Sequence, residues 1–265
     1  MTRQPLHTME LGQDGSRVLF LHGLFGQGRN WTTIGKALAD RHRVLLADLP
    51  HHGRSPAPDH FDYLDLAEYV ADLLIATGGA DDPACVVGHS MGGKVAMLVA
   101  LRHPEMVGRL VVADMAPVAY GAARDFVSFA AAMQGLDLTA LERRQDADRL
   151  LETAVPDPTI RGFLLQNLRH QGDRWYWQLN LDVLARDLDR LSGWPEEQLA
   201  GTAPYDGPVL WLAGERSNYV TDEYAEAMRR WFPHYRKVTI KDAGHWLHSE
   251  QPDVFLAVLR QFLGD

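Results

Sequence analysis

The chain has 265 residues, of which 46% are hydrophobic and 23% are charged, a composition typical of a globular protein that folds on its own. Its formal net charge of -9 disfavours nucleic acid and anionic lipid as partners, and no cluster of lysine or arginine reverses that charge locally. Cys85 is the only cysteine, which excludes an intrachain disulfide and a thiolate metal cluster and suits a reducing compartment.

Residues 1–15 lack the apolar run of a signal peptide, and no later stretch approaches the roughly eighteen uninterrupted apolar residues of a membrane-spanning helix. We therefore expect a cytoplasmic location, no insertion into a membrane and a small molecule as the binding partner. No pattern in the sequence indicates a particular oligomeric state.

Short apolar runs alternate with helical patterns along most of the chain, as in parallel strands connected by helices. The predicted strands, buried on both faces, span 17–21, 43–47, 84–87, 110–113, 209–213 and 237–240. The predicted helices span 30–40, 64–76, 91–103, 221–232 and 253–262. Asn30 and Thr221 are predicted N-caps, while Pro104 and Pro233 are predicted to end the helices that they follow.

This alternation stops between about Val118 and Tyr205, where helical patterns follow one another without intervening strands. The segment has apolar stripes of its own, a predicted capping box from Thr139 to Glu142, and an aromatic cluster at 175–177. We predict an α/β core made of residues 1–117 and 206–265, with residues 118–205 forming a helical cap that covers the sheet as a lid.

Ser90 stands between two glycines in the stretch VVGHSMGGKVA, and the stretch joins a predicted strand to a predicted helix. This is the context of a GxSxG nucleophile elbow, in which the chain turns so sharply that side chains at positions 88 and 92 would collide with neighbouring elements. The helix that follows directs its N-terminal backbone N–H groups, including that of Met91, at negative charge developing beside Ser90.

A serine hydroxyl needs a base to accept its proton. His245 follows the last predicted strand in DAGHWLH, where a fold with the chain order serine, acid, histidine places the base. His248 is the alternative. Gly244 favours His245, because it permits a tight turn at the strand end, and a structural role is expected for His248.

The acid of the predicted triad has two candidates. Many enzymes with this order carry an aspartate after the penultimate strand in a GxxD pattern, but here that position is Ser217. Asp114 ends the strand after the nucleophile strand, at the same edge of the sheet. Glu215 is the alternative, because its longer side chain could reach from the penultimate strand.

The glycine-rich stretch HGLFG follows the first predicted strand and lies next to the elbow. We expect the backbone N–H of Leu24, together with that of Met91, to form an oxyanion hole. His22 is expected to brace this loop by hydrogen bonds. A histidine pair, His51 and His52, lacks the spacing of a metal site, so we expect loop bracing there and no bound metal.

Three aromatic residues are candidate substrate contacts. Phe25 neighbours Leu24, Trp246 neighbours the predicted base, and Trp177 belongs to the aromatic cluster of the lid. Each has an alternative role in packing: Phe25 in its loop, Trp246 in the core, and Trp177 at the junction between lid and core.

The motifs GHSMGG, HGLFG, DxPxHGxS and the late GHW together resemble the α/β-hydrolase superfamily over nearly the whole chain. HGLFGQGRNW, ADMAPVAY, FLLQNL and AGHWLHSEQPD resemble the small YbfF-type bacterial esterases and their mitochondrial abhydrolase-domain relatives. Members of that branch take the acid from the strand after the nucleophile strand, so the resemblance implies Asp114 rather than Glu215.

These residues predict a cofactor-free serine esterase for small to medium acyl esters, in which Ser90, His245 and Asp114 form and hydrolyse an acyl-enzyme. The same triad could instead cleave thioesters, amides or carbon–carbon bonds. An aminopeptidase would need lid carboxylates facing the pocket. The candidates for that role are Asp157, Asp173, Asp182 and Asp187. The remaining alternative is a hydrolase-fold scaffold without catalysis.

Overall fold

A seven-stranded sheet forms the centre of the computed structural model, which describes residues 3–121 and 124–265. Its spatial order is β1-β3-β2-β4-β5-β8-β9, and only β1 runs antiparallel to its neighbour. The strands are β1 (Thr8–Leu11), β2 (Ser16–Leu21), β3 (His42–Ala47), β4 (Ala84–His89), β5 (Val107–Ala113), β8 (Val209–Gly214) and β9 (Tyr235–Ile240).

All six predicted strands lie within strands of this sheet, which confirms the predicted α/β class. The central strands β4 and β8 are buried along their whole length, which explains why they read as continuous apolar runs. The edge strand β1 was not predicted. Two of its four residues are exposed and two are partly buried, so it lacks the apolar run that marks the others.

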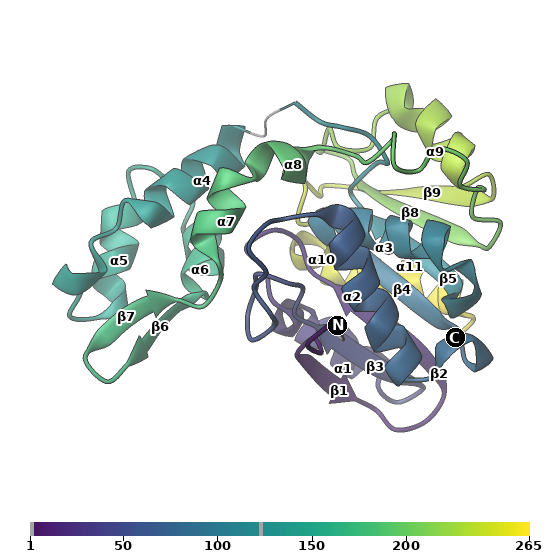
Figure 1. Cartoon of the computed structure of the whole chain (residues 1–265), viewed down its shortest axis with the longest axis horizontal. Helices are drawn as coiled ribbons and strands as arrows, with labels where there is room; N and C mark the ends of the chain where they lie inside the picture. The colour runs from purple at the N-terminus through teal and green to yellow at the C-terminus, as the bar shows by residue number, and fades with distance from the viewer. Residues whose placement is uncertain (1–2, 122–123) are drawn as a thin grey trace.

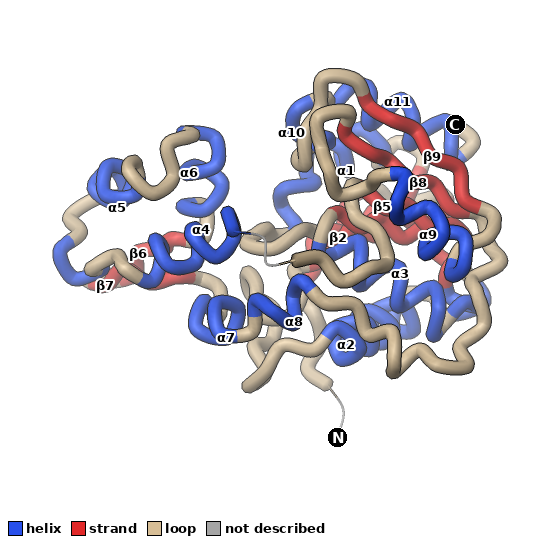
Figure 2. Tube along the Cα trace, turned by 90° about the horizontal axis from the view of Figure 1, so that it is seen from above, coloured by secondary structure: helices blue, strands red, loops and turns tan. Residues whose placement is uncertain are grey.

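Helices cover both faces of the sheet, because alternate strand residues point to opposite sides. Leu19 and Leu21 of β2 pack with the cluster beneath α2 (Tyr63–Ala76) and α3 (Met91–Arg102), joined by residues of α9 (Ala225–Trp231). Val18 and Phe20 pack with the opposite cluster, beneath α1 (Thr32–Leu38) and α11 (Pro252–Leu263). Figure 2 shows α1 and α11 on one side of the strands and α2 and α3 on the other.

Two predicted helix starts are wrong in detail. Asn30 lies inside a 3₁₀ turn (Gly28–Trp31) that precedes α1, where its side-chain oxygen accepts from the Gln27 N–H at 2.7 Å. Thr221 precedes a second 3₁₀ turn (Asp222–Tyr224) before α9, and its side chain makes no capping bond. In both places a tight 3₁₀ turn replaces the first turn of the expected α-helix.

The cap segment contains both helices and strands. Its elements are α4 (Arg124–Gln134), a 3₁₀ turn (Leu138–Ala140), α5 (Arg144–Leu151), α6 (Pro158–Leu165), β6 (Leu168–Gln171), β7 (Arg174–Trp177), α7 (Leu181–Arg186) and α8 (Leu188–Ser192). In Figure 1 these elements stand beside the sheet, with α7 and α8 nearest the core. The division of the chain after residues 117 and 205 stays a prediction, and residues 122 and 123 lie outside the described part.

Two expectations for the cap are corrected. The expectation of helical patterns alone missed the hairpin β6–β7, because four-residue strands are too short to show an alternating pattern. The predicted capping box from Thr139 to Glu142 is absent, since Asp137 accepts from the Thr139 N–H at 3.0 Å and so caps the 3₁₀ turn itself. The next helix, α5, is capped instead by Asp146, which accepts from the Arg143 N–H at 3.0 Å.

Across the described ranges, no helix combines the length and the apolarity that crossing a bilayer requires. The cytoplasmic location stays a prediction.

Candidate active site

Ser90 occupies the turn between β4 and α3 with φ 53° and ψ -120°, in the positive-φ region that non-glycine residues rarely adopt. The neighbouring glycines make this turn possible. A Cβ at position 88 would lie 2.2 Å from the Gly92 carbonyl oxygen, and a Cβ at position 92 would lie 2.5 Å from the Leu21 carbonyl oxygen. Any larger residue at either position would therefore push α3 away from β2 or β4.

Ser90, His245 and Asp114 lie in a hydrogen-bonded row, although His245 is more than a hundred residues from the other two along the chain. His245 Nε2 is 2.9 Å from Ser90 Oγ, and His245 Nδ1 is 2.8 Å from Asp114 Oδ2. An ionised carboxylate only accepts, so Nδ1 carries the proton and Nε2 is free to accept the serine proton. Asp114 is completely buried, which shields this charge from solvent.

Asp114 is held in place by groups from the neighbouring strand β8. Its Oδ1 accepts from the Gly214 N–H at 3.0 Å, and its Oδ2 accepts from the Ser217 hydroxyl. Ser217, at the position of the GxxD aspartate, thus donates to Asp114 and leaves no acid at its own position. Glu215 is exposed and accepts from the Asp242 N–H at 3.0 Å, away from His245. The geometry therefore favours Asp114 as the acid.

The backbone N–H groups of Leu24 and Met91 donate to no acceptor within residues 3–121 and 124–265. Both residues line the cavity that contains Ser90, and Met91 begins α3, a helix of 12 residues. Two unused donors beside the serine, one of them at a helix N-terminus, are the arrangement that stabilises an oxyanion.

Buried histidines brace the loop that carries Leu24. His22 Nε2 accepts from the Leu49 N–H at 2.9 Å, and His52 Nε2 accepts from the Phe25 N–H at 3.1 Å. Burial lowers the pKa of both histidines, so both are neutral and can accept at one nitrogen. The ring nitrogens of His51 have no hydrogen-bond partner in the described part of the chain, so only its neighbour braces the loop.

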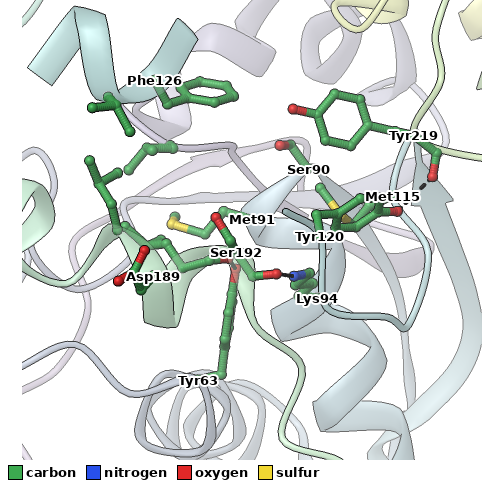
Figure 3. A pocket seen from close by; sticks show the side chains of 14 residues that line it. Tyr63, Ser90, Met91, Lys94, Met115, Tyr120, Phe126, Asp189, Ser192 and Tyr219 are labelled. Atoms are coloured by element: carbon green, nitrogen blue, oxygen red, sulfur yellow. Dashed lines mark hydrogen bonds between the residues drawn. The ribbon is translucent and has the colours of Figure 1, made fainter. Parts of the chain in front are cut away.

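Two cavities meet at Ser90. The first includes Leu24 and Met91 and is shown in Figure 3. Its other lining residues are Tyr63, Lys94, Met115, Tyr120, Phe126, Val127, Leu188, Asp189, Leu191, Ser192 and Tyr219. The second includes His245. Its other lining residues are His22, Gly23, Leu24, Gly26, Asn30, Trp31, His89, Phe126, Phe163, Trp246 and His248.

The three predicted substrate contacts have different positions. Trp246 lines the second cavity, with its ring centroid 5.7 Å from that of His245. Phe25 is completely buried in the core and lines neither cavity, so its role is packing. Trp177 lines neither cavity with Ser90, because it belongs to β7 and packs within the cap. Phe126, which the sequence did not single out, lines both cavities.

Residues 16–252 match the sequence profile of the alpha/beta hydrolase fold. The chain belongs to this family. The prediction drawn from its motifs is thereby confirmed, and the mostly parallel sheet with helices on both faces is the architecture of the family.

Relatives of this hydrolase include proteins named as lipases and esterases. The sn-1-specific diacylglycerol lipase ABHD11 of Mus musculus is 39% identical over 93% of this chain and 80% of its own. The esterase YbfF of Escherichia coli strain K12 is 30% identical over 97% of each chain. A solved structure named as a marine microorganism esterase superposes with a TM-score of 0.92 at 32% identity, covering 97% of this chain and 99% of its own.

Two further histidines, His89 and His248, lie near His245. His89 donates from Nε2 to the His245 carbonyl oxygen at 2.7 Å, and His248 stacks on Trp31 with centroids 4.3 Å apart. Burial lowers the pKa of His89 well below its ordinary value and that of His248 to about 3. His248 therefore stays neutral and packs on Trp31 in the wall of the second cavity, while His245 is the histidine that reaches Ser90.

Carboxylates of the cap were candidate ligands for a substrate amine. Asp157 accepts from the Thr159 N–H at 2.7 Å as the cap of α6, and Asp187 accepts from the Phe61 N–H at 3.0 Å. None of the four candidates, Asp157, Asp173, Asp182 and Asp187, lines a cavity that contains Ser90. Asp189 does line the first cavity, and sequence pattern alone did not distinguish it from its neighbours.

Within the described residues, no three histidine, cysteine or acidic side chains converge as metal ligands.

Lys94 is a buried cation in the wall of the first cavity, one turn after Ser90 (Figure 3). Its Nζ donates to the carbonyl oxygens of Ser192, at 2.8 Å, and Gly193 at the end of α8, and lies over the ring of Tyr120 at 5.1 Å. No carboxylate of the described residues pairs with it. Burial lowers the pKa of Lys94 to about 7.

Because of Lys94, we expect the free energy of unfolding to depend on pH. The lysine's folded pKa of about 7 lies below the ordinary value of 10.5, so the unfolded chain binds more protons between these values and stability rises with pH there. Relative to Lys94→Met, the wild type is expected to gain about 1 kcal/mol per pH unit between pH 8 and 10. Urea unfolding of both proteins across this range measures the difference. Lys36→Met, at an exposed site on α1, is the control. A difference that stays constant with pH would contradict the prediction.

Proposed function

We propose that this protein is a carboxylesterase in which Ser90, His245 and Asp114 form the catalytic triad. The observation that carries the proposal is the pair of hydrogen bonds joining these residues, 2.9 Å and 2.8 Å long, beside two unused backbone donors. The names of the relatives, lipase and esterase, support an ester as the bond that is cleaved.

The reaction follows from this geometry. His245 Nε2 takes the proton of Ser90 as the hydroxyl oxygen attacks the ester carbonyl, and Asp114 stabilises the imidazolium that forms. The Leu24 and Met91 N–H groups hold the negative oxygen of the tetrahedral intermediate. His245 then protonates the departing alkoxide, and a water activated by the same nitrogen releases the acid from the acyl-enzyme.

The two cavities fit the two parts of an ester. The alcohol part must leave beside His245, because that residue protonates it, so we assign the second cavity to the alcohol. The acyl part then occupies the first cavity, whose walls are mainly apolar and which is bounded by Lys94 and α8. Lys94 and α8 at this boundary favour small to medium acyl groups.

The partner that we propose is a small acyl ester, and the net charge of -9 disfavours a nucleic acid. A cytoplasmic location is part of the proposal. It rests on Cys85, the single and buried cysteine of the chain, which leaves the fold independent of an oxidising compartment.

A matched substrate panel tests the bond that is cleaved. Purified protein is assayed with butyryl esters, the corresponding thioesters and aminoacyl amides, and labelled with a fluorophosphonate probe. We expect labelling and the highest kcat/KM for the esters. A clear preference for thioesters or amides would replace the proposed activity, and folded protein that neither labels nor hydrolyses any of the three would indicate a non-catalytic scaffold.

Phe126 is expected to limit the length of the acyl group, because it lines the first cavity at Ser90. In Phe126→Ala, kcat/KM for the shortest esters should fall about 10-fold as a contact of roughly 1–3 kcal/mol is lost, and the optimum should move to longer chains. A series of p-nitrophenyl esters from acetate to decanoate measures this. Phe163→Ala is the matched control, since Phe163 lines the second cavity and not the first. Unchanged chain-length preference in Phe126→Ala would refute the acyl assignment.

A further inference from the structure

Asn167 joins the cap to the loop that carries the first oxyanion donor. It lies between α6 and β6, is completely buried, and uses every polar atom of its amide. Its Oδ1 accepts from Gln27 Nε2 at 2.6 Å, while its Nδ2 donates to the carbonyl oxygens of Phe25 at 2.8 Å and Leu164 at 3.1 Å. Because two carbonyls face Nδ2 and a donor faces Oδ1, only one orientation of the amide satisfies all three partners.

The loop that Asn167 holds is strained. A hydrogen bond from the Gly26 N–H to the Gly23 carbonyl oxygen, 2.9 Å long, closes a turn around Leu24 and Phe25. Phe25 has a φ of 60° at the third position of this turn, where glycine or asparagine is usual. A phenylalanine in this conformation costs about 1–3 kcal/mol and persists only when its surroundings hold it.

Side chains of the core and of the cap hold Phe25 from opposite sides. The core supplies His52, which accepts from the Phe25 N–H at 3.1 Å. The cap supplies Asn167, which donates to the Phe25 carbonyl oxygen at 2.8 Å, and Gln166, whose Nε2 donates to it at 3.4 Å. The Leu24 N–H belongs to the Gly23–Leu24 peptide at the start of the same turn, two peptide units before the carbonyl that Asn167 holds. This N–H has no acceptor among the described residues, and Leu24 lines the cavity at Ser90. The direction of that N–H therefore depends on a contact made by the cap.

Further bonds hold the same cap junction against the core. Asn30 Nδ2 donates to Gln166 Oε1 at 2.8 Å, and the Arg29 guanidinium donates to the Gln166 carbonyl oxygen at 2.9 Å. The two motifs HGLFGQGRNW and FLLQNL, about 140 residues apart, thus meet along one seam. Asn167 makes the shorter of the two bonds from this seam to the strained turn, 2.8 Å against 3.4 Å for Gln166 Nε2.

We propose that Asn167 is a positioning residue that makes the oxyanion hole depend on the docked cap. The proposal rests on the proposed function, because it assumes that Leu24 donates to the oxyanion. Asn167 touches no reacting atom. It acts by keeping the turn at Phe25 in the conformation that directs the Leu24 N–H at the intermediate, so its loss affects the transition state more than substrate binding.

The decisive variant is Asn167→Asp, which keeps the shape of the side chain. It replaces the donor Nδ2 by a carboxylate oxygen, which is repelled by the carbonyl oxygens of Phe25 and Leu164. Ester kcat is expected to fall about 10- to 100-fold. This loss is smaller than the roughly 10²- to 10³-fold loss in kcat that follows deletion of an oxyanion-hole donor, and KM should change less than three-fold. Affinity for a trifluoromethyl ketone, which forms an oxyanion on Ser90, should fall in parallel. The ratio of variant to wild-type kcat should rise as pH falls, because a protonated aspartate can again donate to the Phe25 carbonyl.

Asn180→Asp is the matched control, since it adds the same charge to the cap at a side chain that only accepts, from the Val183 N–H. Its kcat should stay within two-fold of the wild type. Gln27→Met is the second variant, because it removes the donor that orients Asn167 without introducing a charge. It should lower kcat in the same direction by a smaller factor, and it keeps the proposal testable if Asn167→Asp does not fold.

The outcomes separate this inference from the function on which it rests. A folded Asn167→Asp that keeps the wild-type kcat overturns the inference alone, as does a loss confined to KM or a loss that does not respond to pH. If Asn167→Asp does not fold, an unchanged kcat in Gln27→Met overturns it. A wild-type protein that neither labels with fluorophosphonate nor hydrolyses esters removes the proposed function and this inference together.

Discussion

Replacement of Ser90 by alanine is expected to lower kcat for ester hydrolysis by roughly 10⁵- to 10⁶-fold and to abolish fluorophosphonate labelling. The hydroxyl is the attacking group in the proposed reaction, and no other hydroxyl lies within hydrogen-bond distance of His245 Nε2 in the described residues. Initial rates with a p-nitrophenyl ester and in-gel detection of the probe measure both effects.

The fold should survive this substitution. Ser90 makes no side-chain capping bond to α3, and among the described residues its hydroxyl is hydrogen-bonded only to His245. The thermal midpoint should therefore move by a few degrees at most. Ser128→Ala, at an exposed serine of α4, is the control and should keep full activity. Hydrolysis by Ser90→Ala within ten-fold of the wild type would remove the proposed mechanism.

Asp114→Asn is expected to lower kcat about 10⁴-fold. The amide can present a hydrogen-bond donor to His245 Nδ1, which moves the imidazole proton to Nε2 and leaves no lone pair to accept the proton of Ser90. The variant also lacks the negative charge that stabilises the imidazolium. Pre-steady-state kinetics should show slow acylation without a burst of p-nitrophenol.

Glu215→Gln is the matched control for the choice of acid. Glu215 is exposed and bonds to the Asp242 N–H, so its amide should keep kcat within about two-fold of the wild type. A larger loss in Glu215→Gln than in Asp114→Asn would reverse the assignment. Circular dichroism of Asp114→Asn checks that its buried contacts with Gly214 and Ser217 still form.

The parallel strands and the turn at Ser90 were predictable because their signals are local. Each core strand is a contiguous apolar run buried on both faces, and the glycines at positions 88 and 92 follow from the steric limits of one turn. His245 could be placed for the same reason, since it directly follows a strand whose end lies at the edge of the sheet that carries Ser90.

The sequence positions alone did not decide which carboxylate is the acid of the proposed triad. Asp114 and Glu215 both follow strands at the correct edge, and chain order permits either. The resemblance to a family favoured Asp114. The tertiary structure supports it physically, because only Asp114 is within hydrogen-bond distance of His245 while Glu215 turns toward Asp242.

The cavities and the seam between cap and core were decided by tertiary structure alone. Lys94 lies in an apolar helix where its burial gives no local signal, and its partners, the last carbonyls of α8, lie about a hundred residues away. Phe126 and Trp177 are both cap aromatics, but only the packing of α4 and β7 places the first at Ser90 and the second elsewhere.

By itself the sequence determined the six parallel strands of the sheet, the nucleophile turn and the set of groups able to do the chemistry, because each depends on neighbouring residues and on the direction of one strand. Which side chains enclose the substrate, and how Asn167 of the cap holds the turn at Phe25, depends on contacts across some 140 residues. Such contacts exist only after the chain has folded, since the pairing of distant segments is set by the packing of the whole core.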